Sequence, residues 1–371
     1  MSNKIKVGVV GLGFGADFLP IYQNHPHAEL YAICQRTEIK LREAAKKYGI
    51  EKFCTDYRDL LKMKEIDAIH VVTPVDTHTD IVLDCLQAEK HVACTVPMGL
   101  SVEECSRIVK LRRKVNRVYM MMETSAYTRE FLYVKGLKEE GKLGKIQFLR
   151  GSHMQDMEQW GPPWPGWPPL NYATHAVSPL AILADAPVEW VFGAGSGRIR
   201  ENYIKNYNSP FAVESMFLKF KDVDVFGEVT RSLYDTVRQY IESFDVYGQK
   251  LSFEWNRLEN EEPVLYLGGE DAKHIKIPDT GNMLPKEISV FTRSEEVMDD
   301  DEKKHLSFIQ GSGHGGSHPH MVHEFIMACV QNRDSAIDAE KAANWTCAGL
   351  SGHISAMKGG EKIHIPDFWN L

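Results

Sequence analysis

The fold of this chain is decided by residues 4–16, which read KIKVGVVGLGFGA. The apolar, β-branched run Ile5–Val10 predicts a buried strand, and the residues after it fit the pattern G-x-G-x-x-[G/A]. In this pattern Gly11 permits a tight turn out of the strand, and Gly13 lets a pyrophosphate approach the backbone. Ala16 allows the next helix to pack close to the strand, and that helix offers free N–H groups to phosphates. We therefore predict a dinucleotide-binding site at this turn.

The second predicted strand, Glu29–Cys34, bears on which dinucleotide binds. Most NAD sites place a carboxylate at the tip of this strand, where it holds the adenine ribose. This chain has Gln35 and Arg36 there instead. Arg36 can pair with the 2′-phosphate of NADP, which Gln35 does not repel. Alternatively, Arg36 stacks on the adenine or points to solvent, which suits NAD, so the tip alone leaves both cofactors open.

Composition limits the class of protein and its partners. The chain has 371 residues, enough for two domains with sizeable cores. Its net charge of −8 is spread along the sequence, which argues against nucleic acid or an anionic membrane as a partner. There is no apolar run of membrane-spanning length, and the first strand begins too early for a signal peptide. Since the seven cysteines are scattered without a C-x-x-C pair, we expect a cytoplasmic protein with reduced thiols.

The first part of the chain, residues 1–122, alternates strand-like and helical runs. This rhythm predicts an α/β domain with a parallel, doubly wound sheet, which would bind the dinucleotide. The further predicted strands are Ala68–Val72, His91–Cys94 and Val118–Met122, and the predicted helices are Lys40–Tyr48, His78–Ala88 and Val102–Lys114.

The second part, residues 123–371, follows a different rhythm. After a helix over residues 130–140, strand-like runs follow one another with short turns, which predicts an α+β domain with a mostly antiparallel, open-faced sheet. An open face is commonly covered by a second copy, so we expect this domain to bind substrate and to build a homodimer or homotetramer. The predicted strands are Ile146–Gly151, Val188–Gly195, Phe211–Phe220, Asp224–Ser232, Tyr240–Tyr247 and Lys250–Trp255, the last helices are His320–Gln331 and Ala336–Lys358, and Ser294–Lys304 is a charged loop.

The glycine motif, the segment Val72-Thr73-Pro74 followed by His78, and the two-domain plan resemble the glucose-fructose oxidoreductase/inositol dehydrogenase family. The resemblance covers essentially the whole chain and implies an NAD(P)-dependent enzyme of carbohydrate metabolism. Typical members carry Glu-Lys-Pro after the fourth strand, where the lysine contacts the nicotinamide ribose and the hydroxyl group that is oxidised. This chain has Thr95-Val96-Pro97 there, so the ammonium group is missing. The departure argues against the ordinary dehydrogenase mechanism.

A second family element, Asp-x-Gly-x-His-x-x-Asp, corresponds to residues 171–178, which read NYATHAVS. The histidine, which acts at the substrate hydroxyl in the family, is kept as His175, while both acids are replaced. With the missing lysine, residues 120–127 (MMMETSAY) and residues 313–316 (GHGG), this variant is similar to the NAD-dependent α-N-acetylgalactosaminidases and related NAD-dependent glycosidases. In that branch the cofactor is regenerated within each catalytic cycle, which favours tightly held NAD, with NADP as the alternative.

The resemblance implies a redox-neutral hydrolysis of a small glycoside. Carbon 3 of the sugar is oxidised, the acidified proton on carbon 2 is removed, the aglycone leaves, water adds and the ketone is reduced again. His175 is the candidate base at the hydroxyl group, with a structural role at a helix start as the alternative. Tyr127 is the candidate second base, with packing at the domain junction as the alternative, and Tyr172 is the reserve. The expected cofactor contacts are Gly11, Gly13, Phe14, Gly15, Ala16, Gln35, Arg36, Thr73, Pro74, His78, Thr95, Pro97 and Glu123.

An unusual aromatic loop, residues 160–169, reads WGPPWPGWPP just before His175. Its indoles can stack on sugar C–H faces, because aromatic rings give a large contact area at low entropy cost. Alternatively, the loop packs on its own body or on a neighbouring subunit. The expected substrate contacts are Trp160, Trp164, Trp167, His153, Gln155 and Thr174.

A tract of histidines near the C-terminus raises the question of a metal site. Because it has no cysteine or carboxylate at a familiar ligand spacing, we predict no metal and a loop near the active site instead. Two other functions stay open: an ordinary sugar dehydrogenase or 3-oxidase of the same fold, and a sugar- and cofactor-binding protein without turnover. Val96 argues against the first and His175 against the second. The tract consists of His314, His318, His320 and His323.

Overall fold

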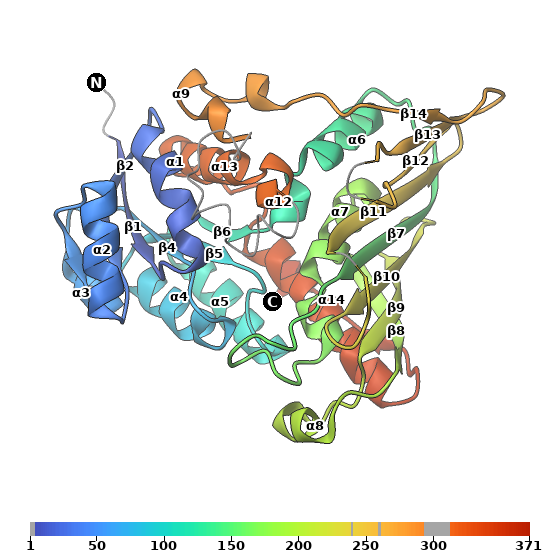
Figure 1. Ribbon diagram of the computed structural model, residues 1–371, viewed down its shortest axis with the longest axis horizontal. Coiled ribbons are helices and arrows are strands. Elements are labelled where there is room, and N and C mark those ends of the chain that lie inside the picture. Colours follow the sequence, from blue (N-terminus) through green and yellow to red (C-terminus); the bar gives the residue numbers. More distant parts are fainter. Residues whose placement is uncertain (1–3, 239, 259–260, 293–311) are drawn as a thin grey trace.

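The first sheet is the predicted parallel sheet. The computed structural model describes residues 4–238, 240–258, 261–292 and 312–371. Six strands lie in the order β3-β2-β1-β4-β5-β6 (Figure 1), and each pairs in parallel with its neighbours. In this doubly wound order, ligands bind beyond the carboxyl ends of the strands, where the chain order reverses between β1 and β4. The strands are β1 Ile5–Val10, β2 Ala28–Cys34, β3 Phe53–Cys54, β4 Ala68–Val71, β5 His91–Thr95 and β6 Tyr119–Met122.

Helices connect these strands close to the predicted bounds. They are α2 (Glu38–Tyr48), α4 (His78–Gln87) and α5 (Val102–Lys114). The start of α5 is set by Ser101, whose hydroxyl accepts a hydrogen bond from the Glu104 N–H. The sequence pattern did not reveal β3 and α3 (Tyr57–Lys62), because both are too short to show a clear period.

The glycine turn differs from the prediction in one respect. Gly11 has a φ of +92°, and an added Cβ atom there would lie 2.3 Å from the Val72 carbonyl oxygen. After Gly13 the chain forms a 3-10 turn, η1 (Phe14–Phe18), and then α1 (Leu19–Asn24), so no α-helix begins at the glycines. Gly15 also approaches β4 closely, because an added Cβ there would lie 3.2 Å from Val72 Cβ.

The second sheet has nine strands in the order β14-β13-β12-β11-β7-β10-β9-β8-β15. Among the described strands, every neighbouring pair is antiparallel except β7 and β10. The α/β fold class is thereby confirmed, whereas β13, β14 and β15 had no counterpart in the prediction because they are short. The strands are β7 Ile146–Met154, β8 Val188–Ser196, β9 Val213–Phe220, β10 Phe226–Ser232, β11 Ile241–Gly248, β12 Leu251–Glu254, β13 Val264–Leu267, β14 Lys273–His274 and β15 Ile363–His364.

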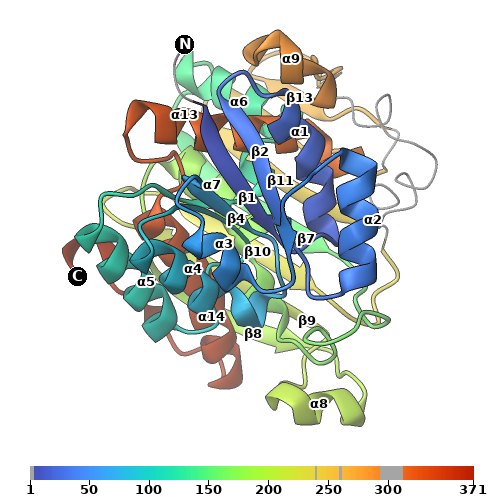
Figure 2. The same ribbon diagram turned by 90° about the vertical axis from the view of Figure 1, so that its left-hand side faces the viewer.

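Helices cover one face of the second sheet. The helices α7 (Thr174–Ala184) and α14 (Ala339–Met357) pack on it, and α14 also reaches α5 beside the first sheet. On the uncovered face, Phe192 and Phe217 are 39% exposed, and their rings stack with centroids 5.4 Å apart. Figure 2 views the molecule with the first sheet in front of the second.

The chain returns to the first sheet near its C-terminus. Helix α13 (His318–Gln331) buries Met321 and Phe325 in the core that also holds Val7 and Val9 of β1. A division of the chain at residue 122 therefore stays a proposal, because later residues contribute to the first core. The predicted charged loop Ser294–Lys304 lies outside the described residues.

The remaining elements are short connections. In the described part of the chain, there is no helix with both the length and the apolar character that crossing a bilayer requires. The remaining helices and turns are α6 Arg129–Glu139, α8 Glu201–Tyr207, α9 Lys286–Ser289, α12 Ser312–Gly316, η2 Val75–Thr77, η3 Thr124–Ala126, η4 Pro169–Tyr172, η5 Gly281–Met283, η6 Val290–Thr292 and η8 Phe368–Asn370.

Candidate active site

A cleft of about 870 Å³ lies between the first sheet and the second. One wall consists of residues that follow the carboxyl ends of β1, β2, β4 and β5, as expected for this strand order. The other wall comes from β7, β11, α7 and the aromatic loop. The predicted cofactor residues that line the cleft are Gly11, Gly13, Phe14, Gln35, Arg36, Thr73, Pro74, His78 and Thr95.

The first wall fits a dinucleotide. A Cβ atom added at Gly13 would meet no atom within 4 Å, so the backbone there is open to the cleft. His78 connects the loops after β4 and β5, because its two ring nitrogens lie 2.9 Å from the Thr73 and Pro97 carbonyl oxygens. The predicted cofactor residues that do not line the cleft are Gly15, Ala16, Pro97 and Glu123.

The tip of β2 places two guanidinium groups beside the cleft. Arg36 lines it as predicted, and Arg58, from the start of α3, lines it as well. Asp56 caps α3 by accepting a hydrogen bond from the Arg58 N–H at 2.9 Å, and it also lines this end. The sequence analysis missed Asp56 and Arg58 because the strand before them is only two residues long.

His175 is the centre of the opposite wall and is held by a carboxylate. Its Nδ1 lies 2.5 Å from Oε1 of Glu123, and both side chains are buried. The same oxygen accepts a hydrogen bond from the Ser125 hydroxyl at 2.7 Å. Burial alone would lower the pKa of His175, but Glu123 and Glu242 outweigh it and raise that pKa. Glu123 therefore orients His175 and leaves Nε2 facing the cleft, which differs from its predicted contact with the cofactor.

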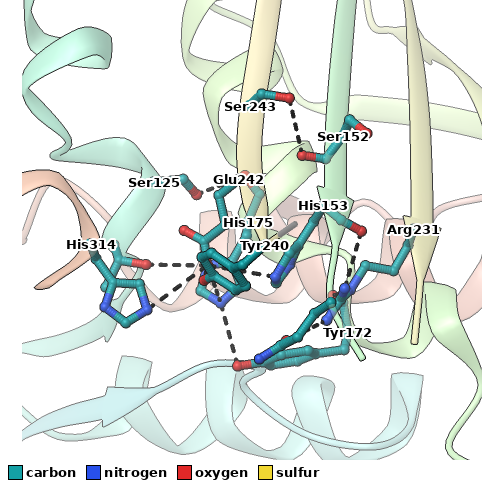
Figure 3. A network of polar contacts seen from close by, with 12 residues as sticks. Ser125, Ser152, His153, Tyr172, His175, Arg231, Tyr240, Glu242, Ser243 and His314 are labelled. Carbon is teal, nitrogen blue, oxygen red and sulfur yellow. Dashed lines mark hydrogen bonds and ion pairs between the residues drawn. The ribbon is translucent and has the colours of Figure 1, made fainter. Parts of the chain in front are cut away.

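Several polar side chains surround Nε2 of His175 (Figure 3). The Tyr172 hydroxyl lies 3.4 Å from it, and Oε1 of Glu242 lies 3.7 Å from it. The same Glu242 oxygen lies 3.7 Å from Nε2 of His153 and 3.9 Å from Nε2 of His314. Burial, followed by the nearby Arg231 guanidinium, lowers the pKa of His153 well below its ordinary value.

Strand register brings part of this cluster together. Across β7, His153 faces Glu242 of β11 on one side and Arg231 of β10 on the other. All three occupy the inward-facing positions of their strands, in phase with buried Leu149, Val229 and Phe244. The sequence analysis missed Arg231, Glu242 and the nearby Tyr240. Arg231 and Glu242 are charged residues at strand positions where the alternation of side chains predicts a buried residue. That mismatch was the signal that could have identified both.

Arg231 holds the ends of these strands in place. Its guanidinium donates hydrogen bonds to the backbone carbonyl oxygens of His153, Tyr172 and Ser232, and to Oε1 of Gln155. Burial lowers the pKa of Arg231 to about 10. Because these bonds fix both His153 and Tyr172, Arg231 is a positioning residue for this wall.

One predicted catalytic residue and two predicted substrate residues do not line the cleft either. Tyr127 packs against both hydrophobic cores, and its pKa is raised by burial and then by Glu324. Because Tyr127 does not line the cleft, we do not retain it as a catalytic candidate. Trp167 and Thr174 are 3% and 1% exposed and belong to the protein interior.

The aromatic loop contributes to both the cleft and the core. Trp160 and Trp164 line the cleft with Pro162 and Pro163, as do the predicted substrate residues His153 and Gln155. The ring of Trp164 lies 5.0 Å from that of Tyr172, which connects the loop to the His175 wall. The loop therefore forms one side of the space that a sugar would occupy next to His175.

The C-terminal histidine tract does not converge on one point. His314 lines the cleft, which agrees with the expected loop near the active site. His318 packs against Phe14 and Phe18. His320 lies 2.8 Å from the Thr280 hydroxyl, and His323 lies 3.0 Å from His25.

Several known enzymes are similar to parts of this chain or to its fold. Residues 5–123 match the model of the oxidoreductase family with the NAD-binding Rossmann fold. Myo-inositol 2-dehydrogenase of Thermotoga maritima is 27% identical over 66% of this chain and 73% of the relative. Glycosyl hydrolase family 109 protein 2 of Phocaeicola vulgatus is 33% identical over 42% of this chain and 40% of the relative. The structure of levoglucosan dehydrogenase with NADH and levoglucosan superposes with a TM-score of 0.78 at 18% identity, covering 98% of this chain and all of the other.

The fold and the cleft define an NAD-binding enzyme with a Rossmann domain and a second, open-faced sheet. Residues 5–123 match the oxidoreductase family with the NAD-binding Rossmann fold, and the longer chain is similar to a myo-inositol dehydrogenase and to a glycosyl hydrolase family 109 protein. Its relatives carry the names of both dehydrogenases and glycosyl hydrolases.

Proposed function

We propose that this enzyme is an NAD-dependent glycosidase that cleaves small glycosides without net oxidation. The observation that carries the proposal is that His175, held by the buried Glu123, lines the same cleft as the dinucleotide wall. A bound nicotinamide supplies reversible oxidation of a ring carbon, and the residues Gly11, Gly13 and Thr73 fit its dinucleotide. The side chains of the opposite wall would orient the sugar and handle its protons.

His175 is the proposed group that acts at the sugar hydroxyl. Glu123 binds Nδ1, so Nε2 is the nitrogen that faces the substrate, and the raised pKa makes the imidazole a stronger base. The Tyr172 hydroxyl, 3.4 Å from Nε2, is the proposed second group at the sugar. Burial raises the pKa of Tyr172 although the nearby Arg231 guanidinium opposes this shift. Tyr172 therefore acts as a hydrogen-bond donor, and its use as a base would require further positive charge.

The residue at position 96 supports a glycosidase over a simple dehydrogenase. Val96 lines the cleft where the family resemblance places a lysine, and no lysine is among the described residues that line this cleft. The name of the Phocaeicola vulgatus relative agrees with a hydrolase. Net oxidation of a sugar is the second candidate, and the name of the Thermotoga maritima relative favours it.

The two candidates differ in product and in isotope content. The purified enzyme is incubated in D₂O with a panel of nitrophenyl glycosides, with no cofactor added beyond what it carries. We expect aglycone release, no accumulation of NADH, and deuterium at carbon 2 of the released sugar, because that carbon is deprotonated before the aglycone leaves. Stoichiometric NADH with a keto-sugar product and no deuterium would establish the dehydrogenase instead.

A further inference from the structure

Three side chains from separate elements converge at the wall of the cleft that holds His175. They are His153 on β7, His175 on α7 and Glu242 on β11, and one ligating atom from each lies within 4.8 Å of the others. Oε1 of Glu242 lies 3.7 Å from Nε2 of each histidine. Figure 3 shows the two imidazoles and the carboxylate directed toward one point.

His153 has unused polar atoms at this point. Its side chain is 1% exposed, and neither ring nitrogen has a hydrogen-bond partner. Buried polar atoms without a partner are rare in proteins and costly. An imidazole lone pair directed at a carboxylate and a second imidazole is the arrangement of a metal ligand.

We infer that His153, His175 and Glu242 bind a first-row divalent cation such as Zn²⁺. Two imidazoles and one carboxylate form a set that suits these cations, whereas Mg²⁺ and Ca²⁺ prefer oxygen ligands. Ligand atoms about 2.0–2.2 Å from Zn²⁺ lie roughly 3.3 Å apart in a tetrahedron. The two separations from Glu242 Oε1 are 3.7 Å, and the two imidazole nitrogens lie within 4.8 Å of each other, so a bound cation would draw the three side chains inward.

Neighbouring side chains orient the three proposed ligands, as they do in known metal sites. Glu123 binds Nδ1 of His175 at 2.5 Å, so Nε2 is the nitrogen left to coordinate. The Tyr240 hydroxyl donates to Oε1 of Glu242 and fixes that carboxylate. Nε2 of His314, 3.9 Å from the same oxygen, lies close enough to join as a fourth ligand or to face a coordinated molecule. The Arg231 guanidinium is engaged with carbonyl and amide oxygens and does not pair with Glu242 at salt-bridge distance in the described contacts.

This inference deepens the proposed function and rests on it. A three-ligand site leaves a coordination position that opens to the cleft, where a sugar oxygen could bind. The cation would then supply the positive charge that Val96 does not. This refines the role proposed for His175: its Nε2 would hold the cation, the cation would polarise the sugar hydroxyl group, and the hydroxyl proton would pass to the His314 imidazole that faces the coordinated molecule. The histidines involved differ from the tract that the sequence analysis considered, apart from His314.

The test measures the cation directly. The holoenzyme is freed of metal with a chelator, checked for retained NAD, and titrated separately with Zn²⁺ and Co²⁺. We expect about one cation per chain, and a Co²⁺ absorption spectrum typical of nitrogen and oxygen ligands. Glu242→Gln and His153→Gln should each weaken binding by at least the 10- to 100-fold that is typical for loss of a supporting partner. Turnover should fall on chelation and return with the cation.

A matched control separates this site from adventitious binding to other histidines. His323→Gln removes an imidazole from the pair that His25 and His323 form elsewhere, and it should leave cation binding unchanged. Equal binding in wild type and both ligand variants, or no bound cation at micromolar concentrations, would overturn the inference. If the enzyme retains NAD and its turnover is unchanged by chelators, the inferred metal site is wrong while the proposed function stands. If the enzyme binds no NAD, the proposed function is wrong. Circular dichroism confirms that each variant is folded.

Discussion

The two sheets contribute to the same cleft in different ways. In the first sheet, each cofactor residue lies directly beyond a strand, as Gly11 does after β1 and Thr73 does after β4. In the second sheet, His153, Arg231 and Glu242 come from three strands and meet only through register. The wall for the cofactor is therefore a local feature of the chain, while the wall for the substrate is assembled from distant segments.

The two sheets also differ in how they are covered. Helices pack against both faces of the first sheet, as parallel sheets require, whereas the second sheet leaves one aromatic face exposed. We propose that the first sheet binds the cofactor, that the inner face of the second sheet carries the chemistry, and that its outer face supports assembly. Each assignment can be tested separately.

The largest effect is expected for Gly13→Val at the first wall. Gly13 has a φ of −63°, which valine tolerates, and its Cβ direction is open, so the fold should survive while the side chain blocks the pyrophosphate. We expect NAD affinity to fall more than about 100-fold, or about 2.7 kcal/mol, by calorimetry. Gly136→Ala, another open position, is the control. Unchanged NAD affinity in Gly13→Val would show that this wall does not bind the pyrophosphate.

The next effect is expected for His175→Ala at the second wall. Loss of the group that acts at the hydroxyl should reduce turnover about 100- to 10,000-fold, with NAD still bound. The measurement combines glycoside turnover with NAD titration, and exposed His274→Ala serves as the control. A variant within a few-fold of wild type would assign His175 a structural role and remove the difference between the two walls.

The outer face of the second sheet should control assembly. We expect the wild-type protein to form a dimer or tetramer at micromolar concentration, because association would bury the exposed, stacked aromatic rings of this face. Phe192→Glu combined with Phe217→Glu should shift the light-scattering mass toward the monomer. Ile39→Glu, at a 71% exposed position in the first domain, should not. A monomeric wild type would contradict the role given to this face.

The smallest effect is expected at the tip of β2. If Arg36 binds a 2′-phosphate, Arg36→Ala should weaken NADP about tenfold, or about 1.4 kcal/mol, and change NAD affinity by only a few-fold. Arg58, which lines the same end, provides the comparison variant Arg58→Ala. Equal losses for both cofactors would show that Arg36 contacts the adenine and not the phosphate.

The sequence predicted the first wall more fully than the second. The glycines, the Thr73-Pro74 segment and His78 were found because their motif lies within short stretches, and His175 was found through its family element. Glu123 was predicted to contact the cofactor and contacts His175, and Tyr127 packs between the two cores, as the alternative to its catalytic role proposed. Glu242 and Arg231 were missed because they belong to no local motif.

By itself, the sequence determined the parallel sheet, its glycine turn and the presence of a second, mostly antiparallel sheet, since hydrophobic periodicity and backbone requirements act over neighbouring residues. Tertiary structure alone decided that Glu242 lies 3.7 Å from both His153 and His175, and that Gly15 packs on Val72. Such contacts depend on strand register and on loops that bring together residues far apart in the chain. Local sequence patterns do not determine which residues of neighbouring strands lie opposite each other. The residues that meet at the second wall could therefore be identified only from the tertiary structure.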